Sequence, residues 1–213
     1  MNVEALANEV LPCLERIIQF SLINNLNVHT SIGGKYGELW VASELWRYKP
    51  RLAKERYDVK GVEKRGSCDI ILEKTSKKLE VKWGMLHHRK NDEFVKKVRE
   101  GVPYWGLGFS GGTQFTKGKF DYCILLAAEK DGAHPQHTFV IKVDDMTESS
   151  MGGKRKGAFG KENFYIEFSD NEDYYCKRSW YPYGPTPLEK LLFEQKREYK
   201  KRWKRLKENG ELE

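Results

Sequence analysis

The chain has 213 residues, enough for one domain, or one domain with a small addition, around a proper hydrophobic core. It carries 38 Lys and Arg against 31 Asp and Glu, and the formal net charge of +7 favours a polyanionic partner. Four separated cysteines form no Cys-x-x-Cys pair, and no apolar run approaches the roughly 18 residues of a membrane span. These features argue against a disulfide-stapled, zinc-binding or membrane protein and predict a soluble cytoplasmic one.

Two helices are expected at the start of the chain. Apolar residues recur at helical spacing over residues 3–24, where Pro12 should either kink the helix or open a second one at its first turn. Residues 29–34 read as a loop, and residues 35–48 as the next helix, which Pro50 ends.

Two acids on this second helix compete for a functional role. Glu38 falls in the expected first turn, where a carboxylate also suits the helix dipole. Glu44 comes six residues later, about 240° around the helix, so the two cannot face the same site. A solvated capping acid is the plain alternative for Glu38.

Three strands are expected next, as an antiparallel meander over residues 56–64, 68–73 and 79–84. Alternation puts Glu80 and Lys82 on one face of the third strand. With an even-numbered connection, Asp69 shares that face, across from Lys82 and diagonal to Glu80, about 7–8 Å away. Two such carboxylates can share a divalent cation. An odd connection turns Asp69 to the other face, and the hairpin is then simply a charged surface.

The spacing Asp69-x10-Glu80-Val81-Lys82, behind Gly34-Lys35-Tyr36-Gly37-Glu38, resembles the PD-(D/E)xK nuclease superfamily. The resemblance spans about residues 30–130, with Cys68 where the motif has proline. It implies a restriction endonuclease-like α/β fold, a mixed central sheet with helices on both faces. It also implies that Asp69, Glu80 and the Val81 carbonyl hold Mg²⁺, or Mn²⁺ in its place. Lys82 would be catalytic, and Glu38, rather than Glu44, would complete the site.

The implied activity is metal-dependent hydrolysis of phosphodiester bonds in DNA. A type II restriction endonuclease that cuts double-stranded DNA as a homodimer is the leading expectation. A structure-specific repair nuclease, such as a Holliday-junction resolvase of the same fold, is the alternative within the superfamily. A nucleic-acid-binding module with an inactive site is the alternative outside it.

A basic run follows the third strand. His87, His88, Arg89 and Lys90 would grip phosphates beside the scissile bond, or form a solvated turn. A short helix is expected from about residue 92. Residues 103–118 read as a glycine-rich, substrate-facing loop, whose G-x-G-x-x-G pattern lacks the strand and helix that a dinucleotide site needs.

Three strands are expected later, at residues 120–128, 138–143 and 164–168. The first is apolar throughout, as is typical of a central strand buried on both faces. The polar loop that precedes the last strand contains Lys154, Arg155 and Lys156, which would clamp DNA or remain an inert loop.

The C-terminal segment, residues 186–213, is expected to form a basic helix that packs on or extends from a nuclease domain at residues 1–185. Thr186-Pro187-Leu188-Glu189 is a capping box with proline at the first helical position. Nine Lys or Arg and only two Glu occupy residues 190–207. The one-sided charge predicts nucleic-acid contact through Lys200, Lys201 and Arg202. The aromatic stretch at 170–187 is expected to pack this helix onto the body.

Overall fold

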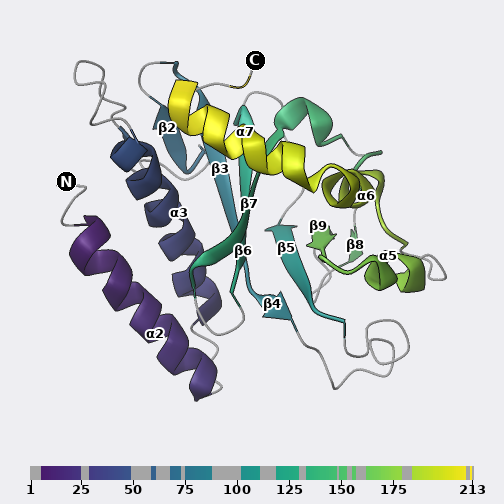
Figure 1. Ribbon diagram of the computed structural model, residues 1–213, viewed down its shortest axis with the longest axis horizontal. Coiled ribbons are helices and arrows are strands. Elements are labelled where there is room, and N and C mark those ends of the chain that lie inside the picture. The colour runs from purple at the N-terminus through teal and green to yellow at the C-terminus, as the bar shows by residue number, and fades with distance from the viewer. Residues whose placement is uncertain are drawn as a thin grey trace.

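The fold is seen in a computed structural model as two β-sheets with helices around them (Figure 1). The structure describes residues 6–24, 29–48, 59–60, 68–72, 75–87, 102–110, 119–129, 133–147, 149–152, 155–156, 162–178, 184–209 and 212. The expected combination of helices with a mixed sheet is confirmed. No helix in these segments is long and apolar enough to cross a membrane.

The N-terminal helices form one side of the molecule (Figure 1). A π-helical turn, η1 (Leu6–Val10), leads into α2 (Leu11–Ile23), whose first turn contains Pro12, where a missing N–H costs nothing. Helix α3 spans His29–Tyr48, so the expectation of a loop at residues 29–34 is wrong. Glu38 therefore lies near the middle of α3, not in its first turn, and the helix-dipole argument for it does not apply.

Tertiary packing explains why α3 starts early despite its glycines. A Cβ at Gly33 would overlap the ring of Trp83, and a Cβ at Gly37 would lie 3.1 Å from Trp83 Cβ and from Leu126 Cδ1. The helix backbone thus approaches the sheet closely at these two positions. Burial against Trp83 offsets the poor helix propensity of glycine, which is about 1 kcal/mol per residue.

The first sheet has the order β1-β2-β3-β6-β7. Its strands are β1 (Val59–Lys60), β2 (Ile70–Leu72), β3 (Lys78–Gly84), β6 (Tyr122–Ala128) and β7 (Pro135–Lys142). The expected β1-β2-β3 meander is confirmed where it is described, and β6 joins β3 in parallel. All seven residues of β6 are buried, in agreement with the apolar run in the sequence.

A second sheet, which the sequence did not predict, has the order β4-β5-β9-β8. It contains β4 (Leu86–His87), β5 (Tyr104–Ser110), β9 (Glu162–Phe168) and β8 (Arg155–Lys156). The assignment of residues 103–118 to a loop is wrong for β5, in which Trp105 to Ser110 pair with β9 and Tyr104 pairs with β4. Trp105 and Leu107 are buried on alternate positions, so a period of two outweighs the glycines between them.

The first sheet separates two hydrophobic cores. On one face, α3 residues such as Val41 and Leu45 pack on Ile124 and Leu126, together with the C-terminal part of α7. On the other face, the second sheet and α6 cover Cys123, Leu125 and Ala127. Helices were expected on both faces, but much of one face is covered by strands instead.

The C-terminal helices are α5 (Glu172–Arg178), α6 (Pro187–Glu194) and α7 (Lys196–Asn209), and a 3₁₀ turn, η2 (Val143–Asp145), precedes them. The capping box is confirmed: Thr186 Oγ1 accepts from Glu189 N, and Glu189 Oε2 accepts from Thr186 N at 2.8 Å. The other Glu189 oxygen accepts from Glu167 N at 2.7 Å, so one buried carboxylate joins α6 to β9. The expected single helix is interrupted at Gln195.

The aromatic stretch at 170–187 contributes packing, as expected, where it is described. Tyr174 and Tyr175 on α5 are buried, and Tyr175 contacts Phe193 of α6 with ring centroids 4.6 Å apart. Tyr199, Trp203 and Leu206 fix α7 to the body.

Gly33→Ala and its neighbour Gly34→Ala should have opposite effects. We expect Gly33→Ala to lower the free energy of unfolding by about 1–3 kcal/mol, because the added methyl group overpacks the Trp83 contact. Gly34→Ala meets nothing within 4 Å and should raise it by about 0.5–1 kcal/mol through helix propensity. Urea denaturation followed by circular dichroism measures both. Equal effects would show that α3 does not approach Trp83 as described.

Candidate functional site

The hairpin of β2 and β3 brings two acids together. Ile70 pairs with Leu79 and Ile71 with Lys78. Asp69 lies just before β2, and its N–H donates to Leu79 O at 2.9 Å, so Asp69 is not opposite Lys82 as the even-numbered example had it. Its side chain reaches the N–H of Val81, and the Glu80 carboxylate acts on its pKa, so the two acids lie close together.

Asp69 is held by the backbone of β3 and perturbed by its neighbours. Its Oδ2 accepts a hydrogen bond from Val81 N at 2.7 Å. Burial and then the Glu80 carboxylate raise the pKa of Asp69 to about 6, against the opposing effect of that hydrogen bond. The raised pKa thus reflects burial first and neighbouring negative charge second.

Glu80 is buried, with 7 % of its surface exposed, and pairs with Lys82. Lys82 Nζ donates to Glu80 Oε1 at 2.6 Å. The two residues are two positions apart on β3 and therefore lie on the same face of the strand. Burial by itself would lower the pKa of Lys82, but the adjacent carboxylate outweighs it and the pKa is raised. Lys82 thus stays protonated, as a buried ion pair requires.

Helix α3 brings Glu38, and not its rival Glu44, toward these groups. The Glu38 carboxylate is close enough to contribute to the raised pKa of Asp69. It also accepts from Lys35 Nζ at 2.5 Å, one turn earlier on α3. Glu44 instead pairs with Lys207 Nζ of α7 at 3.3 Å and with Arg47. The preference for Glu38 agrees with this geometry.

Two buried thiols, for which we predicted no functional role, border the acids. Cys123 is the β6 residue in register with Glu80, and Cys68 immediately precedes Asp69. Burial raises the pKa of both thiols. The position of Cys123 depends on the parallel pairing of β3 with β6, so spacing along the chain carried no signal for it.

The donor set is compatible with Mg²⁺. This ion keeps several water ligands and commonly takes only one or two carboxylates from a protein, which Asp69 and Glu80 supply. In an antiparallel ladder, the N–H and C=O of one residue point to the same neighbouring strand. Since Val81 N donates to Asp69, the Val81 carbonyl also faces the side of β3 on which Asp69 lies, where the resemblance implies a third ligand. Within the described segments, no three His, Cys, Asp or Glu side chains form a ready-made metal centre.

The basic residues expected to contact phosphates are only partly placed. His87 ends β4, whereas His88, Arg89 and Lys90 lie outside the described residues, as does Lys154. Arg155 and Lys156 form β8 and pair with Asn163 and Glu162 of β9. The expectation of a loop is wrong at these two positions.

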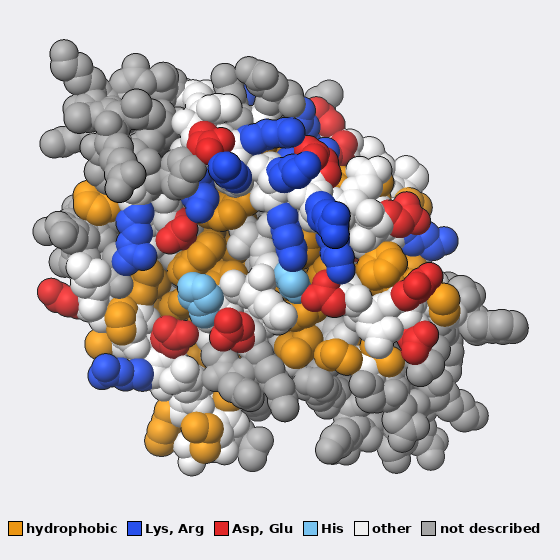
Figure 2. Space-filling model, in the orientation of Figure 1, with side chains coloured by type: hydrophobic (Ala, Val, Ile, Leu, Met, Phe, Trp, Pro, Cys, Tyr) orange, Lys and Arg blue, Asp and Glu red, His pale blue; other side chains and the backbone are white. Residues whose placement is uncertain are grey.

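The basic residues of α7 fall into two groups, those that contact the rest of the protein and those that lie at its surface. Arg202 pairs with Asp145 Oδ2 at 3.3 Å and lies over the Tyr199 ring, 4.3 Å from its centroid. Lys201 is exposed and Lys200 half-exposed, and neither forms an ion pair with any described residue. Lys and Arg side chains gather over α7 on the face shown in Figure 2. The structure thus gives Arg202 a packing role and leaves Lys200 and Lys201 at the surface.

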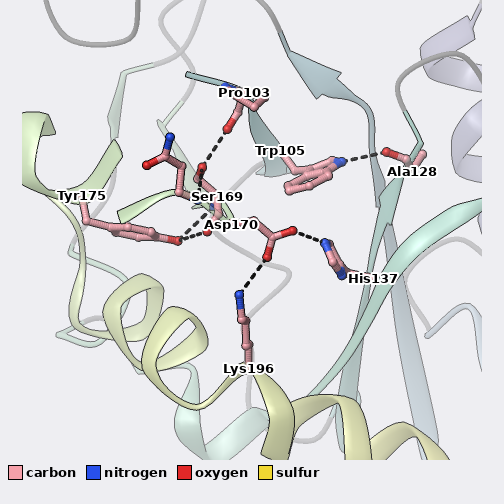
Figure 3. A network of polar contacts seen from close by, with 9 residues as sticks. Pro103, Trp105, Ala128, His137, Ser169, Asp170, Tyr175 and Lys196 are labelled. Atoms are coloured by element: carbon pink, nitrogen blue, oxygen red, sulfur yellow. Dashed lines mark hydrogen bonds and ion pairs between the residues drawn. The ribbon is translucent and has the colours of Figure 1, made fainter. Parts of the chain in front are cut away.

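A second polar cluster joins β7, α7 and the segment after β9 (Figure 3). His137 Nε2 lies 2.5 Å from Asp170 Oδ2, and Lys196 Nζ donates to Asp170 Oδ1 at 3.2 Å. His137 is 8 % exposed and sits edge-on to Trp105 and Phe168. Its Nδ1 has no hydrogen-bond partner among the residues that the structure describes. Nε2 is paired with Asp170 and Nδ1 is enclosed, so we interpret this cluster as structural. We call the contact of His137, Asp170 and Lys196 the latch.

Comparison with protein-family models and with curated protein sequences gives no match. The site must therefore be interpreted from its own geometry and chemistry.

The latch makes stability depend on pH. Burial lowers the pKa of His137 despite the opposing attraction of Asp170. The folded state therefore binds a proton less readily than the unfolded state, whose His titrates near 6.5. We expect the free energy of unfolding to fall as the pH drops below about 6.5, by at most about 1.4 kcal/mol per pH unit. The lowered pKa of Asp170 acts with the same sign, but at lower pH.

Urea unfolding of the wild type and of His137→Phe at pH 7.5 and 5.5 tests this dependence. The variant should lose most of the difference between the two pH values, since its phenyl ring does not titrate. An unchanged pH dependence would assign the effect to another group.

Proposed function

We propose that the protein is a metal-dependent endonuclease that hydrolyses phosphodiester bonds in double-stranded DNA. One observation supports this above the others: Asp69, bound to Val81 N at 2.7 Å, is close enough to the Glu80 carboxylate for its pKa to be raised by it, and Lys82 contacts Glu80 at 2.6 Å. Two neighbouring acids and an amine are the groups that the PD-(D/E)xK pattern requires. Glu38 comes from α3, Asp69 from the residue before β2, and Glu80 and Lys82 from β3, and the other three act electrostatically on Asp69.

The sheet order agrees with the proposed restriction endonuclease-like fold. A meander, β1-β2-β3, carries the acids, and a fully buried strand, β6, then adds in parallel next to β3. A buried strand next to the strand that carries the acids supports the resemblance, although β3, and not β6, is the middle strand of the five.

Asp69, Glu80 and the Val81 carbonyl would hold Mg²⁺ or Mn²⁺. Such an ion activates water and neutralises charge on a phosphate when it is bound. Lys82, which stays protonated beside Glu80, would orient the attacking water and stabilise charge on the phosphate oxygens. In the reaction, water oxygen adds to phosphorus, one P–O bond of the diester breaks, and the departing oxygen takes up a proton. Glu38 would add negative charge next to Asp69 and strengthen cation binding.

Substitution of the site should remove cleavage and leave DNA binding. We expect Glu80→Gln and Lys82→Ala each to lower the cleavage rate by at least about 100-fold, because each removes a group that stabilises the transition state. On α3, Glu38→Gln should lower the rate, and the matched variant Glu44→Gln should not. Cleavage of plasmid DNA with Mg²⁺, with EDTA as the control, measures the rates. Full activity in both Glu80→Gln and Lys82→Ala would show that the site is wrongly assigned.

The same assay on three DNA forms distinguishes the possible biological roles. Discrete fragments from plasmid and linear duplex indicate the restriction enzyme that we favour, while cleavage confined to four-way junctions indicates a resolvase. Binding without cleavage, in the presence of either metal, indicates an inactive module and contradicts the proposal.

The two groups of basic residues on α7 should differ in their effect on DNA affinity. We expect Lys200→Ala/Lys201→Ala to reduce the slope of log K against log salt by up to about 0.9 per lost phosphate contact. Arg202→Ala should leave the slope unchanged and lower stability instead, because Arg202 is bound to Asp145. Fluorescence anisotropy with labelled duplex from 50 to 300 mM salt measures the slopes. Equal slopes in the wild type and the double variant would assign α7 a purely structural role.

A further inference from the structure

Large apolar side chains are exposed on one surface only within the described part of the chain. They are Val10 at 41 %, Ile17 at 44 %, Phe20 at 61 % and Ile23 at 79 %. The thiol of Cys13 is exposed among them. Residues 10, 13, 17 and 20 are spaced by three, four and three, so they form one stripe along the helix that starts in η1 and continues through α2. We call this surface the α2 stripe.

The α2 stripe faces away from the rest of the molecule. Leu11 and Ile18 on the opposite face of α2 are buried against Tyr36 of α3, and α3 separates α2 from the sheet (Figure 1). A contiguous apolar surface of this kind marks an interaction site in soluble proteins.

The charges near the α2 stripe favour a copy of the same chain as its partner. The whole chain carries +7, which opposes self-association over most of its surface. Residues 6–24, in contrast, contain only Glu9, Glu15 and Arg16. Two of these, Glu9 and Arg16, are exposed and lie seven residues, or two turns, apart along the stripe. One acid and one base at this spacing are self-complementary.

A lipid surface fits the α2 stripe less well. Helices that lie on membranes present many Lys and Arg on the polar side to anionic headgroups, and η1 and α2 contain only Arg16. The strongly basic helix is α7, whose apolar residues are already buried in the body.

We infer that the α2 stripe is a homodimer interface in which two α2 helices pack antiparallel around a two-fold axis next to Cys13. This register places Glu9 of each copy opposite Arg16 of the other, since 9 and 16 are symmetric about 12.5. Val10 and Ile17 are symmetric about 13.5, so a two-fold axis at residue 13 brings both pairs to within one residue rise, about 1.5 Å, of direct opposition. The contact is isologous, so each favourable pair occurs twice. The inference rests on the exposed surface of α2 and does not depend on the proposed chemistry.

The expected affinity follows from the size of the contact. The 18 residues of η1 and α2 extend over about 27 Å, which is short for an interface and places it at the weak end of specific association. We therefore expect a dissociation constant on the order of micromolar, so monomer and dimer exchange in solution.

Sedimentation velocity at 1 to 100 µM protein tests this interface. The wild type should shift from monomer to dimer across this range, and Ile17→Glu should stay monomeric. The matched control, Gln136→Glu on an exposed β7 position, should behave as the wild type. Circular dichroism verifies that each variant is folded, as expected for exposed sites.

Two further variants test the register. Glu9→Arg and Arg16→Glu should each weaken the dimer about tenfold or more, and the double exchange should restore it. With Cys176→Ser removing the other exposed thiol, mild oxidation should link Cys13 to its own copy in the wild-type register and not in Ile17→Glu.

A wild type that stays monomeric at 100 µM would overturn the inference. Binding to anionic vesicles under the same conditions would then identify the α2 stripe as a lipid-facing helix. A dimer that Ile17→Glu leaves intact would place the interface elsewhere and would equally contradict the inference.

Discussion

The complete burial of β6 is the constraint on which the rest of this structure depends. Its residues alternate between two hydrophobic cores, so β6 can be covered only if a helical layer lies on one face and the second sheet lies on the other. Its parallel pairing with β3 fixes where each β3 side chain points. Val81 then belongs to the core on the α3 side, and Glu80 and Lys82 are directed to the opposite face, where a carboxylate and an amine in near contact satisfy each other.

The local patterns of the sequence identified most elements and the β1-β2-β3 meander, but not the pairing of β3 with β6 or of β5 with β9. The apolar run at 120–128, the alternation at 79–83 and the capping box at Thr186 each have a strong local cause, and each element is present. The errors fall where tertiary contacts outweigh local preference. Residues 29–34 look like a loop because of two adjacent glycines. In the structure, the Trp83 ring packs against helix α3 at Gly33, where a side chain would not fit. β5 looks like a loop because glycines interrupt its apolar residues, yet Trp105 to Ser110 pair with β9.

In the candidate site, too, local patterns predict some features and tertiary contacts decide the others. The period of two places Glu80 with Lys82 without any knowledge of the fold, and the motif order points to Asp69 and Glu38. The position of Asp69 depends on the Leu72 N–Lys77 O bond next to the turn and on the bond from Asp69 N to Leu79 O, and the sequence predicts neither. Cys123 approaches the acids only through a pairing between strands some forty residues apart. Arg202 reads as one more surface charge until η2 brings Asp145 to it.

Glu189 has a consequence for how the chain can be shortened. Its carboxylate caps α6 with one oxygen and holds the backbone of β9 with the other, while Leu188 and Leu192 fill the core beneath the first sheet. Deletion of the C-terminal residues from Thr186 onward would strip the cover from that core and leave the Glu167 N–H without its acceptor. The basic C-terminal segment is thus an integral part of the fold. A fragment that ends before this segment would expose apolar surface and aggregate.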